Sequence, residues 1–272
     1  MNHEKITSRD NPRLKMVRKV RDGKQDDRLF VEGLRLCEET LRSPLKIIEC
    51  YFRGDFVSTE RGATLVNQVA TRGAEIFEIG NNGFDSIAET PSPQGIILIC
   101  ERPAASPNRI DESLGTTESI PVVLFLHEIS NPSNLGAIVR TCEAAGASGL
   151  IISRSSADVF SPKALRASMG SAFRLPVWAD VSLPEALDWA KLNEMVISAA
   201  DLRAEHSYTS IDWTRPRLLV FGSEAHGLGQ AHLSCIEESI QIPMRNNVES
   251  LNIAVSCGIL LFEAKRQIEA AD

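Results

Sequence analysis

The sequence predicts an α/β protein of two domains. Its 272 residues exceed the roughly 150 that a single domain usually contains. Short apolar runs alternate with segments of helical periodicity in both halves of the chain, and a polar stretch rich in Pro, Ser and Thr separates the halves. We therefore expect an α/β domain over residues 1–104, a linker over residues 105–119 and a second α/β domain over residues 120–272.

The first domain begins with a helix signal. Asn11 followed by Pro12 is typical of a helix start, because the Asn side chain can cap the helix and proline fits its first position. Leu14, Val17 and Val20 continue at helical spacing. The rest of the pattern predicts strands over 28–31, 46–52, 75–79 and 95–100 and helices over 34–41, 60–70 and 84–88.

The second domain alternates more clearly. Residues 122–127 form a continuous apolar run, which is typical of a parallel strand buried on both faces. Ser182 and Glu185 have the spacing of a capping box at a helix start. The remaining pattern predicts strands over 149–153, 195–199, 218–222 and 240–243 and helices over 135–145, 161–172 and 250–267.

Composition excludes several classes of protein. The chain is 43% hydrophobic and 24% charged, as soluble globular proteins are. No apolar run approaches the roughly 18 residues needed to cross a bilayer, and residues 1–15 contain no apolar segment that could act as a secretory signal. The cysteines and histidines lack the spacings of disulfide frameworks and metal sites. We expect a cytoplasmic protein with buried, reduced thiols and no metal.

Charge is unevenly distributed along the chain. The net charge is -7, yet residues 1–35 hold ten Lys and Arg against six Asp and Glu. A second basic cluster consists of Arg154, Lys163, Arg166 and Arg174. Local patches rather than net charge determine phosphate binding. Charge alone favours solvated helix faces over a nucleic-acid surface, and both interpretations stay open at this point.

Several common enzyme motifs are missing. The sequence contains no G-x-x-x-x-G-K-[ST] loop, no G-x-G-x-x-G after a strand and no G-x-S-x-G elbow. A P-loop hydrolase, a dinucleotide-binding domain and an α/β hydrolase are therefore disfavoured. An α/β domain without these loops must bind its ligand by another arrangement.

The first of three segments whose residues could take part in binding or catalysis covers residues 131–146. Asn134 and Gly136 lie in the turn after the apolar strand, and Arg140 follows one helical turn later on the face of Gly136. Capping and close backbone approach would account for the first two residues. Arg140 lies among apolar neighbours and needs a carboxylate or a phosphate. The pattern leaves a structural ion pair and a functional role equally open.

A second segment, residues 218–228, is a strand that runs into the turn Gly222-Ser223-Glu224. Ligands of open α/β sheets bind at the carboxyl ends of strands, where this turn exposes backbone amides. Glu224 could equally be a plain acid at a helix start. We expect no role for His226.

The third segment covers residues 240–258. A strand ends in a polar loop, and we expect a helix to begin near Ser250. Ser250 and Asn252 provide neutral hydrogen-bonding groups at that start, which capping alone would explain. The small residues within 254–258 make the helix slim, so another element should pack closely against it.

Together, in this order and spacing, the three segments resemble the motifs of the SpoU branch of the SPOUT RNA methyltransferases. The resemblance covers about residues 121–268 and rests on Asn134, Gly136, Arg140, Gly222, Ser223, Glu224, Ile242, Pro243, Met244, Ser250, Leu251 and Asn252. The N-terminal half is similar to the substrate-binding domain of ribosomal-RNA members at Ser8, Asn11, Pro12 and residues 30–33. Ala225 and His226 depart from the family, which more often has glycine and a polar residue there.

The resemblance implies a fold and an activity. Members transfer a methyl group from S-adenosylmethionine to a ribose 2′-hydroxyl, and their catalytic domain is a homodimer with a trefoil-knotted parallel sheet. We therefore expect a SPOUT α/β knot preceded by a small α/β RNA substrate-binding domain. By resemblance the cofactor S-adenosylmethionine is held, without a metal, by Gly222, Ser223, Ile242, Met244 and Leu251.

The resemblance also suggests roles for polar side chains. Arg140 would grip the target phosphate and polarise the 2′-hydroxyl, because a guanidinium with a pKa above about 12 is a poor base. The side chains that orient Arg140 and the ribose would be those of Asn134, Glu224, Ser250 and Asn252. With RNA as the substrate, contacts are expected from Arg9, Arg13, Lys15, Arg166 and Arg174.

The expected substrate is ribosomal RNA, most of all 23S, because transfer-RNA members usually carry only short N-terminal extensions. The alternatives are a transfer-RNA enzyme of the same chemistry, a methyltransferase that confers antibiotic resistance and a non-catalytic RNA-binding or assembly factor. A small-molecule enzyme with an accidental match is remote. The target nucleotide cannot be read from the sequence.

Overall fold

The chain forms two compact units. The computed structural model describes residues 4–117, 119–246 and 248–271. The N-terminal unit consists of Met1–Pro103 and Phe160–Arg174, and the C-terminal unit consists of Ala104–Val159 and Leu175–Asp272. Unlike the predicted domains, the N-terminal unit includes a segment from the second half of the sequence.

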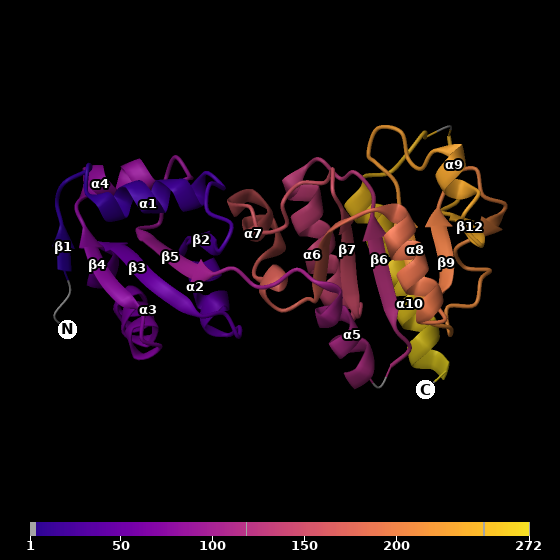
Figure 1. The fold of residues 1–272 in the computed structure, drawn as a ribbon, viewed down its shortest axis with the longest axis horizontal. Helices are drawn as coiled ribbons and strands as arrows, with labels where there is room; N and C mark the ends of the chain where they lie inside the picture. The colour runs from indigo at the N-terminus through magenta and orange to yellow at the C-terminus, as the bar shows by residue number, and fades with distance from the viewer. Residues whose placement is uncertain (1–3, 118, 247, 272) are drawn as a thin grey trace. The chain divides into compact units, whose positions relative to one another are not determined.

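The N-terminal unit is built on a five-stranded mixed sheet with the order β1-β4-β3-β5-β2 (Figure 1). Strands β1, β4 and β3 are parallel, whereas β5 pairs antiparallel with both β3 and β2. The strands are β1 (Glu4–Ile6), β2 (Arg28–Glu32), β3 (Ile47–Arg53), β4 (Glu75–Ile79) and β5 (Ile96–Glu101). The three-residue β1 was not predicted, because it is too short to show a period.

Helices cover both faces of this sheet. Helices α1 (Pro12–Arg21) and α4 (Asn81–Ile87) pack on one face, and α2 (Leu34–Leu41) and α3 (Glu60–Thr71) pack together on the other. The predicted start of α1 is confirmed, since Asn11 Oδ1 accepts a hydrogen bond of 2.8 Å from the amide of Arg13. The apolar stripe of α1 is buried in the core, as its helical spacing predicted.

The C-terminal unit contains a seven-stranded sheet of order β10-β12-β9-β11-β6-β7-β8, in which every pairing between these strands is parallel. The strands are β6 (Val122–Leu126), β7 (Gly149–Ser153), β8 (Val177–Val181), β9 (Val196–Ala200), β10 (His206–Ser207), β11 (Arg217–Phe221) and β12 (Glu238–Gln241). The predicted parallel α/β sheet is confirmed. Because the strands are parallel, all their carboxyl ends lie at one edge.

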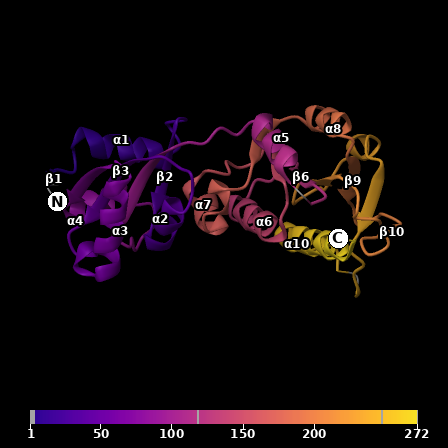
Figure 2. The same ribbon diagram turned by 90° about the horizontal axis from the view of Figure 1, so that it is seen from below.

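Two pairs of helices cover the two faces of this sheet (Figure 2). Helices α5 (Pro107–Thr116) and α8 (Leu183–Leu192) lie on one face, and α6 (Pro132–Ala145) and α10 (Ile253–Ala271) lie side by side on the other. The short α9 (Gln230–Leu233) precedes β12. The capping box at Ser182 is confirmed, with Ser182 and Glu185 bonded reciprocally at the start of α8.

The predicted linker was wrong as a structureless segment. Most of residues 105–119 form α5, while Glu118 lies outside the described residues. Ile110 is fully buried in the core of the C-terminal unit, and Trp189 Nε1 donates a 2.9 Å hydrogen bond to Asp111 Oδ1. Only Ile110 and Leu114 supply apolar contacts from α5, so the apolar positions are too few to reveal a helical period.

The predicted helix over 161–172 is also interrupted. Helix α7 (Pro162–Ser168) ends at Met169, which has a left-handed φ of 51°, and a short 3-10 turn over Ser171–Phe173 follows. Gly170 has a φ of 90°, and a Cβ at that position would lie 2.6 Å from the Cβ of Glu39. This close approach to α2 explains why the segment belongs to the N-terminal unit.

The cysteines are free, and all except the exposed Cys235 are buried. Burial raises the pKa of the Cys50 thiol to about 12, so this thiol is protonated and unreactive near neutral pH. The expectation of buried thiols is thus confirmed for five cysteines and wrong for Cys235. Among the described helices, none is long and apolar enough to span a membrane.

Candidate active site

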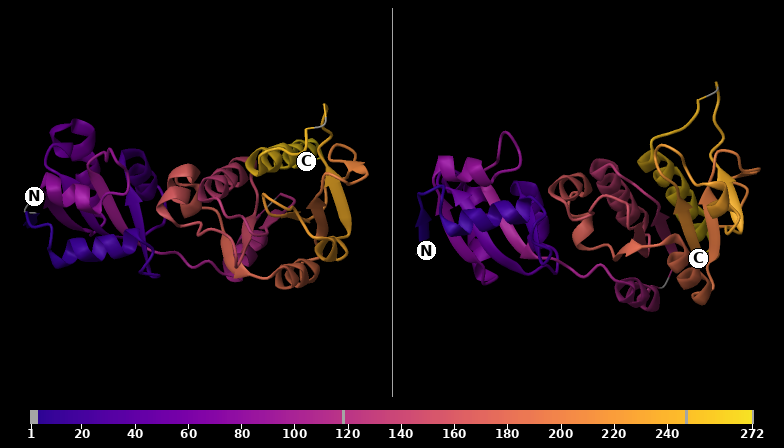
Figure 3. Two further views of the ribbon diagram at one scale, coloured as in Figure 1. Left: turned by 90° about the horizontal axis from the view of Figure 1, so that it is seen from above. Right: turned by 45° about the horizontal axis from the view of Figure 1, so that its top comes forward.

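The three sequence motifs meet at the carboxyl edge of the parallel sheet. They follow β6, β11 and β12, and Figure 3 shows the loop before α10 standing beyond the end of the sheet. Asn134 Nδ2 donates a 2.7 Å hydrogen bond to Glu224 Oε1. Asn252 Nδ2 in turn donates a 3.1 Å hydrogen bond to Asn134 Oδ1. One side chain from each motif therefore takes part in a continuous chain of hydrogen bonds.

Glu224 is held at both carboxylate oxygens. Its Oε2 accepts hydrogen bonds of 3.2 Å from the backbone amide and from the hydroxyl of Ser130. All of these hydrogen-bond donors are neutral groups. Glu224 is therefore more than an acid at a helix start, because it connects the loop after β11 to the start of α6.

The caps of the two neighbouring helices differ from the prediction. Asn131, rather than Asn134, caps α6, with its Oδ1 accepting a 2.9 Å hydrogen bond from the amide of Ser133. Asn252, rather than Ser250, lies at the start of α10, where its Oδ1 accepts a 2.9 Å hydrogen bond from the amide of Ala254. Helix α10 thus begins three residues later than expected, and Ser250 lies in the exposed loop before it.

Arg140 has an exposed side chain on α6. Its guanidinium makes no ion pair or hydrogen bond with any residue in the described part of the chain. The close packing predicted for the helix with small residues at 254–258 is confirmed, because this helix, α10, packs against α6. A Cβ on Gly258 of α10 would lie 3.7 Å from Thr141 Cγ2 of α6. Within the described residues, the structural ion pair that the sequence left open for Arg140 is therefore absent, and its charge is available to a ligand.

A pocket of about 660 Å³ opens beside this network. Its volume lies within the roughly 300–1,000 Å³ that is usual for small-molecule and cofactor sites. All five residues predicted to hold the cofactor line it, as do three of the predicted catalytic residues: Gly222, Ser223, Ile242, Met244, Leu251, Glu224, Ser250 and Asn252. Asn134 and Arg140 are not among its lining residues.

Gly222 gives the turn after β11 its shape. A Cβ at this position would lie 2.1 Å from the carbonyl carbon of Gly227, a distance that no side chain can accept. Ser223 and Gly227 exchange backbone hydrogen bonds of 3.1 and 2.9 Å, and Ser223 Oγ accepts one from the amide of His226. The turn is thus closed by its own backbone and lines the pocket.

Sequence analysis missed one wall of the pocket. Residues 200–203 follow β9 and line the pocket, and Asp201 Oδ1 accepts hydrogen bonds of 3.1 and 3.3 Å from the amide and Nε of Arg203. Strand β9 lies between β11 and β12, which brings this loop to the same edge. The sequence contained the strand but no signal for its place in the sheet. His226, for which no role was expected, also lines the pocket.

The predicted RNA-binding residues near the N-terminus fall into two groups. Arg9 and Lys15 are exposed, and neither side chain has an ion-pair partner within the described ranges. Arg13 instead lies over the ring of Phe77 at 4.4 Å and forms ion pairs with Glu49 at 3.1 Å and Glu75 at 3.0 Å. Arg13 therefore has a structural role of its own.

The other two predicted RNA contacts belong to the N-terminal unit and are also paired. Arg166 of α7 forms an ion pair with Glu89. Arg174 forms an ion pair of 2.9 Å with Glu39 of α2. Both carboxylates neutralise charge that an RNA phosphate would otherwise meet.

No cluster of three or more metal-ligating side chains occurs among the described residues. The rings of His127 and His232 contact each other edge to face, with centroids 4.7 Å apart, but they form only a pair. Their Nδ1 atoms are buried and have no hydrogen-bond partner in the described structure. Burial lowers the pKa of His127, so this ring is neutral near pH 7.

Comparison with known proteins assigns the site to a family. The model of the SpoU rRNA Methylase family matches residues 121–262, and that of RNA 2′-O ribose methyltransferase substrate binding matches residues 30–105. An uncharacterized tRNA/rRNA methyltransferase of Synechocystis is 31% identical, with 98% of this chain and 95% of the relative covered. The 23S rRNA (guanosine(2553)-2′-O)-methyltransferase of Bacillus subtilis is 27% identical, with 96% and 99% covered.

Solved structures agree with the sequence comparisons. An S-adenosylmethionine-bound rRNA methyltransferase from Sinorhizobium meliloti has a TM-score of 0.84 at 27% identity, covering 97% of this chain and 98% of its own. The SpoU methyltransferase AviRb from Streptomyces viridochromogenes, also with S-adenosylmethionine, has a TM-score of 0.84 at 25% identity, covering 94% and 98%.

The fold and the site together define an RNA 2′-O-ribose methyltransferase that uses S-adenosylmethionine. The chain belongs to the SpoU rRNA methylase family.

Proposed function

We propose that this protein methylates a ribose 2′-hydroxyl of 23S ribosomal RNA, with Arg140 as the residue that engages the target. The observation that carries the proposal is the hydrogen-bonded chain from Asn252 through Asn134 to Glu224. Arg140, on the same helix as Asn134, has no hydrogen-bond or ion-pair partner among the described residues. The names of the relatives in Bacillus subtilis and Streptomyces viridochromogenes, both 23S rRNA 2′-O-methyltransferases, support this substrate. A ribosomal substrate implies a cytoplasmic location.

The pocket fits the cofactor by size and by lining. Gly222, Ser223, Ile242, Met244 and Leu251 would hold S-adenosylmethionine, which supplies an electrophilic methyl group on a sulfonium sulfur. Apolar side chains such as Ile242 and Leu251 suit an adenine ring, and the closed turn at Gly222 brings backbone groups within reach of polar atoms.

Arg140 would act by binding and positioning. Its guanidinium can hold a phosphate of the target nucleotide with two parallel hydrogen bonds. Holding the phosphate aligns the neighbouring 2′-hydroxyl for in-line attack, and the positive charge favours the oxygen as it loses its proton. The RNA phosphate itself would accept that proton.

The amide network would orient the site. The Asn134 side chain donates a hydrogen bond to Glu224 and accepts one from Asn252. This chain of hydrogen bonds would fix the starts of both α6 and α10. We assign Glu224 the role of anchoring Asn134 and the loop at Ser130. Ser250, exposed beside this network, would contact the ribose.

RNA binding would fall to the N-terminal unit. Arg9 and Lys15 would contact phosphates directly, since their side chains are exposed. Arg13, Arg166 and Arg174 would exchange a glutamate for a phosphate when RNA binds. Each such exchange would weaken with rising salt, because phosphate contacts release counterions.

We also propose a homodimer through α10. Val255 and Phe262 on this helix are 51% and 49% exposed, which is high for side chains of this size on a packed helix. A second copy of the chain would cover them. The trefoil knot implied by the resemblance belongs to the same proposal, since α10 follows the pocket loop after β12 and packs against α6.

Methyl transfer from labelled S-adenosylmethionine tests the proposal. Unmodified 23S ribosomal RNA and transfer RNA are incubated side by side with the protein, Arg140→Ala and Arg154→Ala. Arg154 is a matched surface arginine that pairs with Glu185. We expect alkali-resistant label in 23S RNA, lost with Arg140→Ala and retained with Arg154→Ala.

The other outcomes separate the alternatives. Label in transfer RNA alone would replace the proposed substrate but leave the chemistry intact. Binding of RNA and cofactor without label in either RNA would favour a non-catalytic assembly factor. Failure to bind S-adenosylmethionine would overturn the proposed pocket.

A further inference from the structure

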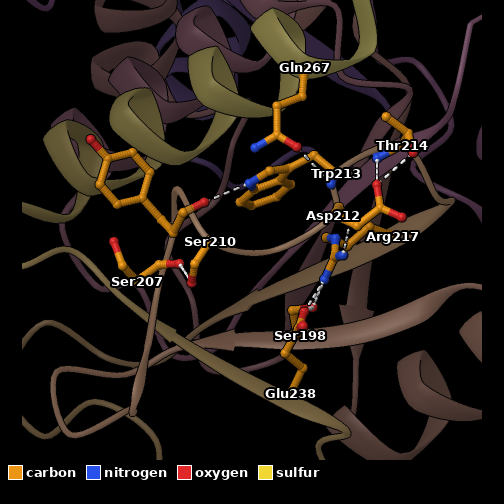
Figure 4. Close-up of polar contacts among 10 residues, drawn as sticks. Ser198, Ser207, Ser210, Asp212, Trp213, Thr214, Arg217, Glu238 and Gln267 are labelled. Atoms are coloured by element: carbon orange, nitrogen blue, oxygen red, sulfur yellow. Dashed lines mark hydrogen bonds and ion pairs between the residues drawn. The ribbon is translucent and has the colours of Figure 1, made fainter. Parts of the chain in front are cut away.

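A buried arginine connects three strands of the C-terminal sheet (Figure 4). Arg217, the first residue of β11, is only 2% exposed. Its Nη1 donates to Ser198 Oγ of β9 and to Glu238 Oε2 of β12, and the Ser198 hydroxyl donates a 3.0 Å hydrogen bond to the same carboxylate oxygen. One guanidinium therefore spans β11, β9 and β12.

The same guanidinium is fixed on its other side. Its Nη2 donates a 2.6 Å hydrogen bond to the carbonyl of Asp212, and its carbon lies 4.9 Å from the centre of the Trp213 ring. The fully buried Trp213 donates from Nε1 to the Tyr208 carbonyl at 2.8 Å and from its amide to Gln267 Oε1 of α10 at 3.3 Å. The network thus reaches the helix whose first turn carries Asn252.

Burial of this charged network carries a free-energy penalty. A buried charge must lose its water, and the Nε of Arg217 is buried without a hydrogen-bond partner among the described residues. Apolar pairs of similar volume often stabilise a core as well as a buried ion pair does. Stability alone therefore does not account for Arg217, and specificity of strand arrangement is the better-founded reason for keeping such a pair.

The three strands that Arg217 connects are the ones that supply the pocket walls. At their carboxyl ends, β9 continues into residues 200–203, β11 into 222–228 and β12 into the loop before α10. Strand β12 has four residues and is bordered on its outer side by the two-residue β10, so few backbone hydrogen bonds fix its register. A slip of one residue would turn its side chains to the other face.

We propose that Arg217 is a positioning residue for the cofactor pocket: it fixes β12 in register with β9 and β11 and so sets the spacing of the three pocket loops. The proposal rests on the pocket being the S-adenosylmethionine site. It does not make Arg217 catalytic, since it lies at the first residue of β11, whereas the pocket loop follows the last.

Titration of S-adenosylmethionine into the full-length protein, with urea unfolding of the same samples, tests this role. The main variant is Arg217→Met/Glu238→Met, which replaces the buried arginine and its partly buried partner with apolar side chains. We expect its unfolding midpoint to stay near that of the wild type while the Kd for S-adenosylmethionine rises at least tenfold. The milder Glu238→Gln keeps an acceptor and should raise the Kd about threefold.

The control is Arg61→Met/Glu38→Met, which removes a bidentate ion pair of 2.7 Å contacts from the N-terminal unit. Its Kd should equal that of the wild type. Wild-type affinity in both Arg217→Met/Glu238→Met and Glu238→Gln would overturn the positioning role, as would a Kd that rises only in proportion to lost stability. Absence of cofactor binding by the wild type would instead overturn the proposed pocket.

Discussion

Arg140 of the C-terminal unit differs from three arginines of the N-terminal unit in how its charge is balanced. In the N-terminal unit, Arg13, Arg166 and Arg174 each lie against a glutamate, so their charge is neutralised within the protein. In the C-terminal unit, Arg140 is exposed and has no such partner in the described structure. A paired arginine can serve RNA only by exchanging partners, whereas an unpaired one is ready to bind. We therefore expect the paired arginines to affect the affinity for RNA and the unpaired Arg140 to affect the rate of methyl transfer.

The largest effect should come from the unpaired arginine. Arg140→Ala should lower kcat about 100-fold or more, because it removes a charge that acts on the reacting nucleotide. The free energy of unfolding should change by less than about 0.5 kcal/mol, since the exposed side chain makes no hydrogen bond or ion pair with the described residues. Initial rates at saturating RNA and urea unfolding measure the two quantities. A decrease in the free energy of unfolding that is large enough to explain the lower kcat would contradict the proposed role of Arg140 in binding the target.

Asn134→Ala should have the next largest effect, with a drop in kcat of about tenfold. Arg140 would remain, but the link between Glu224 and Asn252 would be cut. The KM for RNA should stay close to the wild-type value, because Asn134 is proposed to orient the reacting ribose rather than to hold RNA phosphates. A change in KM alone, with kcat intact, would contradict a role in orienting the site.

In the N-terminal unit, Glu39→Gln and Arg174→Ala should act in opposite directions. Removing the glutamate charge weakens the ion pair that Arg174 forms with Glu39, so RNA affinity should rise by about threefold. Removing the arginine should lower affinity by a similar factor. The slope of the logarithm of the binding constant against the logarithm of salt concentration should fall by the amount expected for about one phosphate contact. Filter binding at several salt concentrations measures both. Equal affinities of the two variants would show that this pair does not meet RNA.

The smallest expected effect concerns the exposed ion pair of Arg61 and Glu38. The hydrogen bonds from Arg61 lower the pKa of the Glu38 carboxyl below its usual 4.5. A lowered folded-state pKa stabilises the protein above the unfolded pKa, and this contribution is lost as pH falls through the folded value. Arg61→Met should therefore lower the free energy of unfolding slightly at pH 7 and by a smaller amount below pH 4. Urea unfolding at both pH values measures the difference, and a cost that grows at low pH would reverse the sign.

Local signals predicted much of this protein. Asn11-Pro12 and the box at Ser182 marked helix starts because capping depends on neighbours in sequence. The three motifs identified Asn134, Glu224 and Asn252 as site residues, and these side chains do meet. Their hydrogen-bond partners could not be predicted, since contacts between residues 90 or more positions apart depend on how the strands are ordered.

The same reason explains what was missed. The place of β9 between β11 and β12 decides that residues 200–203 reach the pocket, and no periodicity encodes that order. The side-chain partners of Arg217 lie on two other strands, β9 and β12. Helix α5 was mistaken for a linker because it buries few side chains. Local chemistry predicts elements and caps, whereas long-range pairing comes only from the folded structure.

The discontinuous make-up of the N-terminal unit limits how this protein can be divided or recombined. A fragment that ends at residue 103 would lack Phe160 and Phe173, which are 3% and 1% exposed in the intact chain. It would also lack Arg166, which pairs with Glu89, and Arg174, which pairs with Glu39. A chimera that exchanges substrate specificity between relatives must therefore transplant two segments, residues 1–103 and 160–174, as one piece.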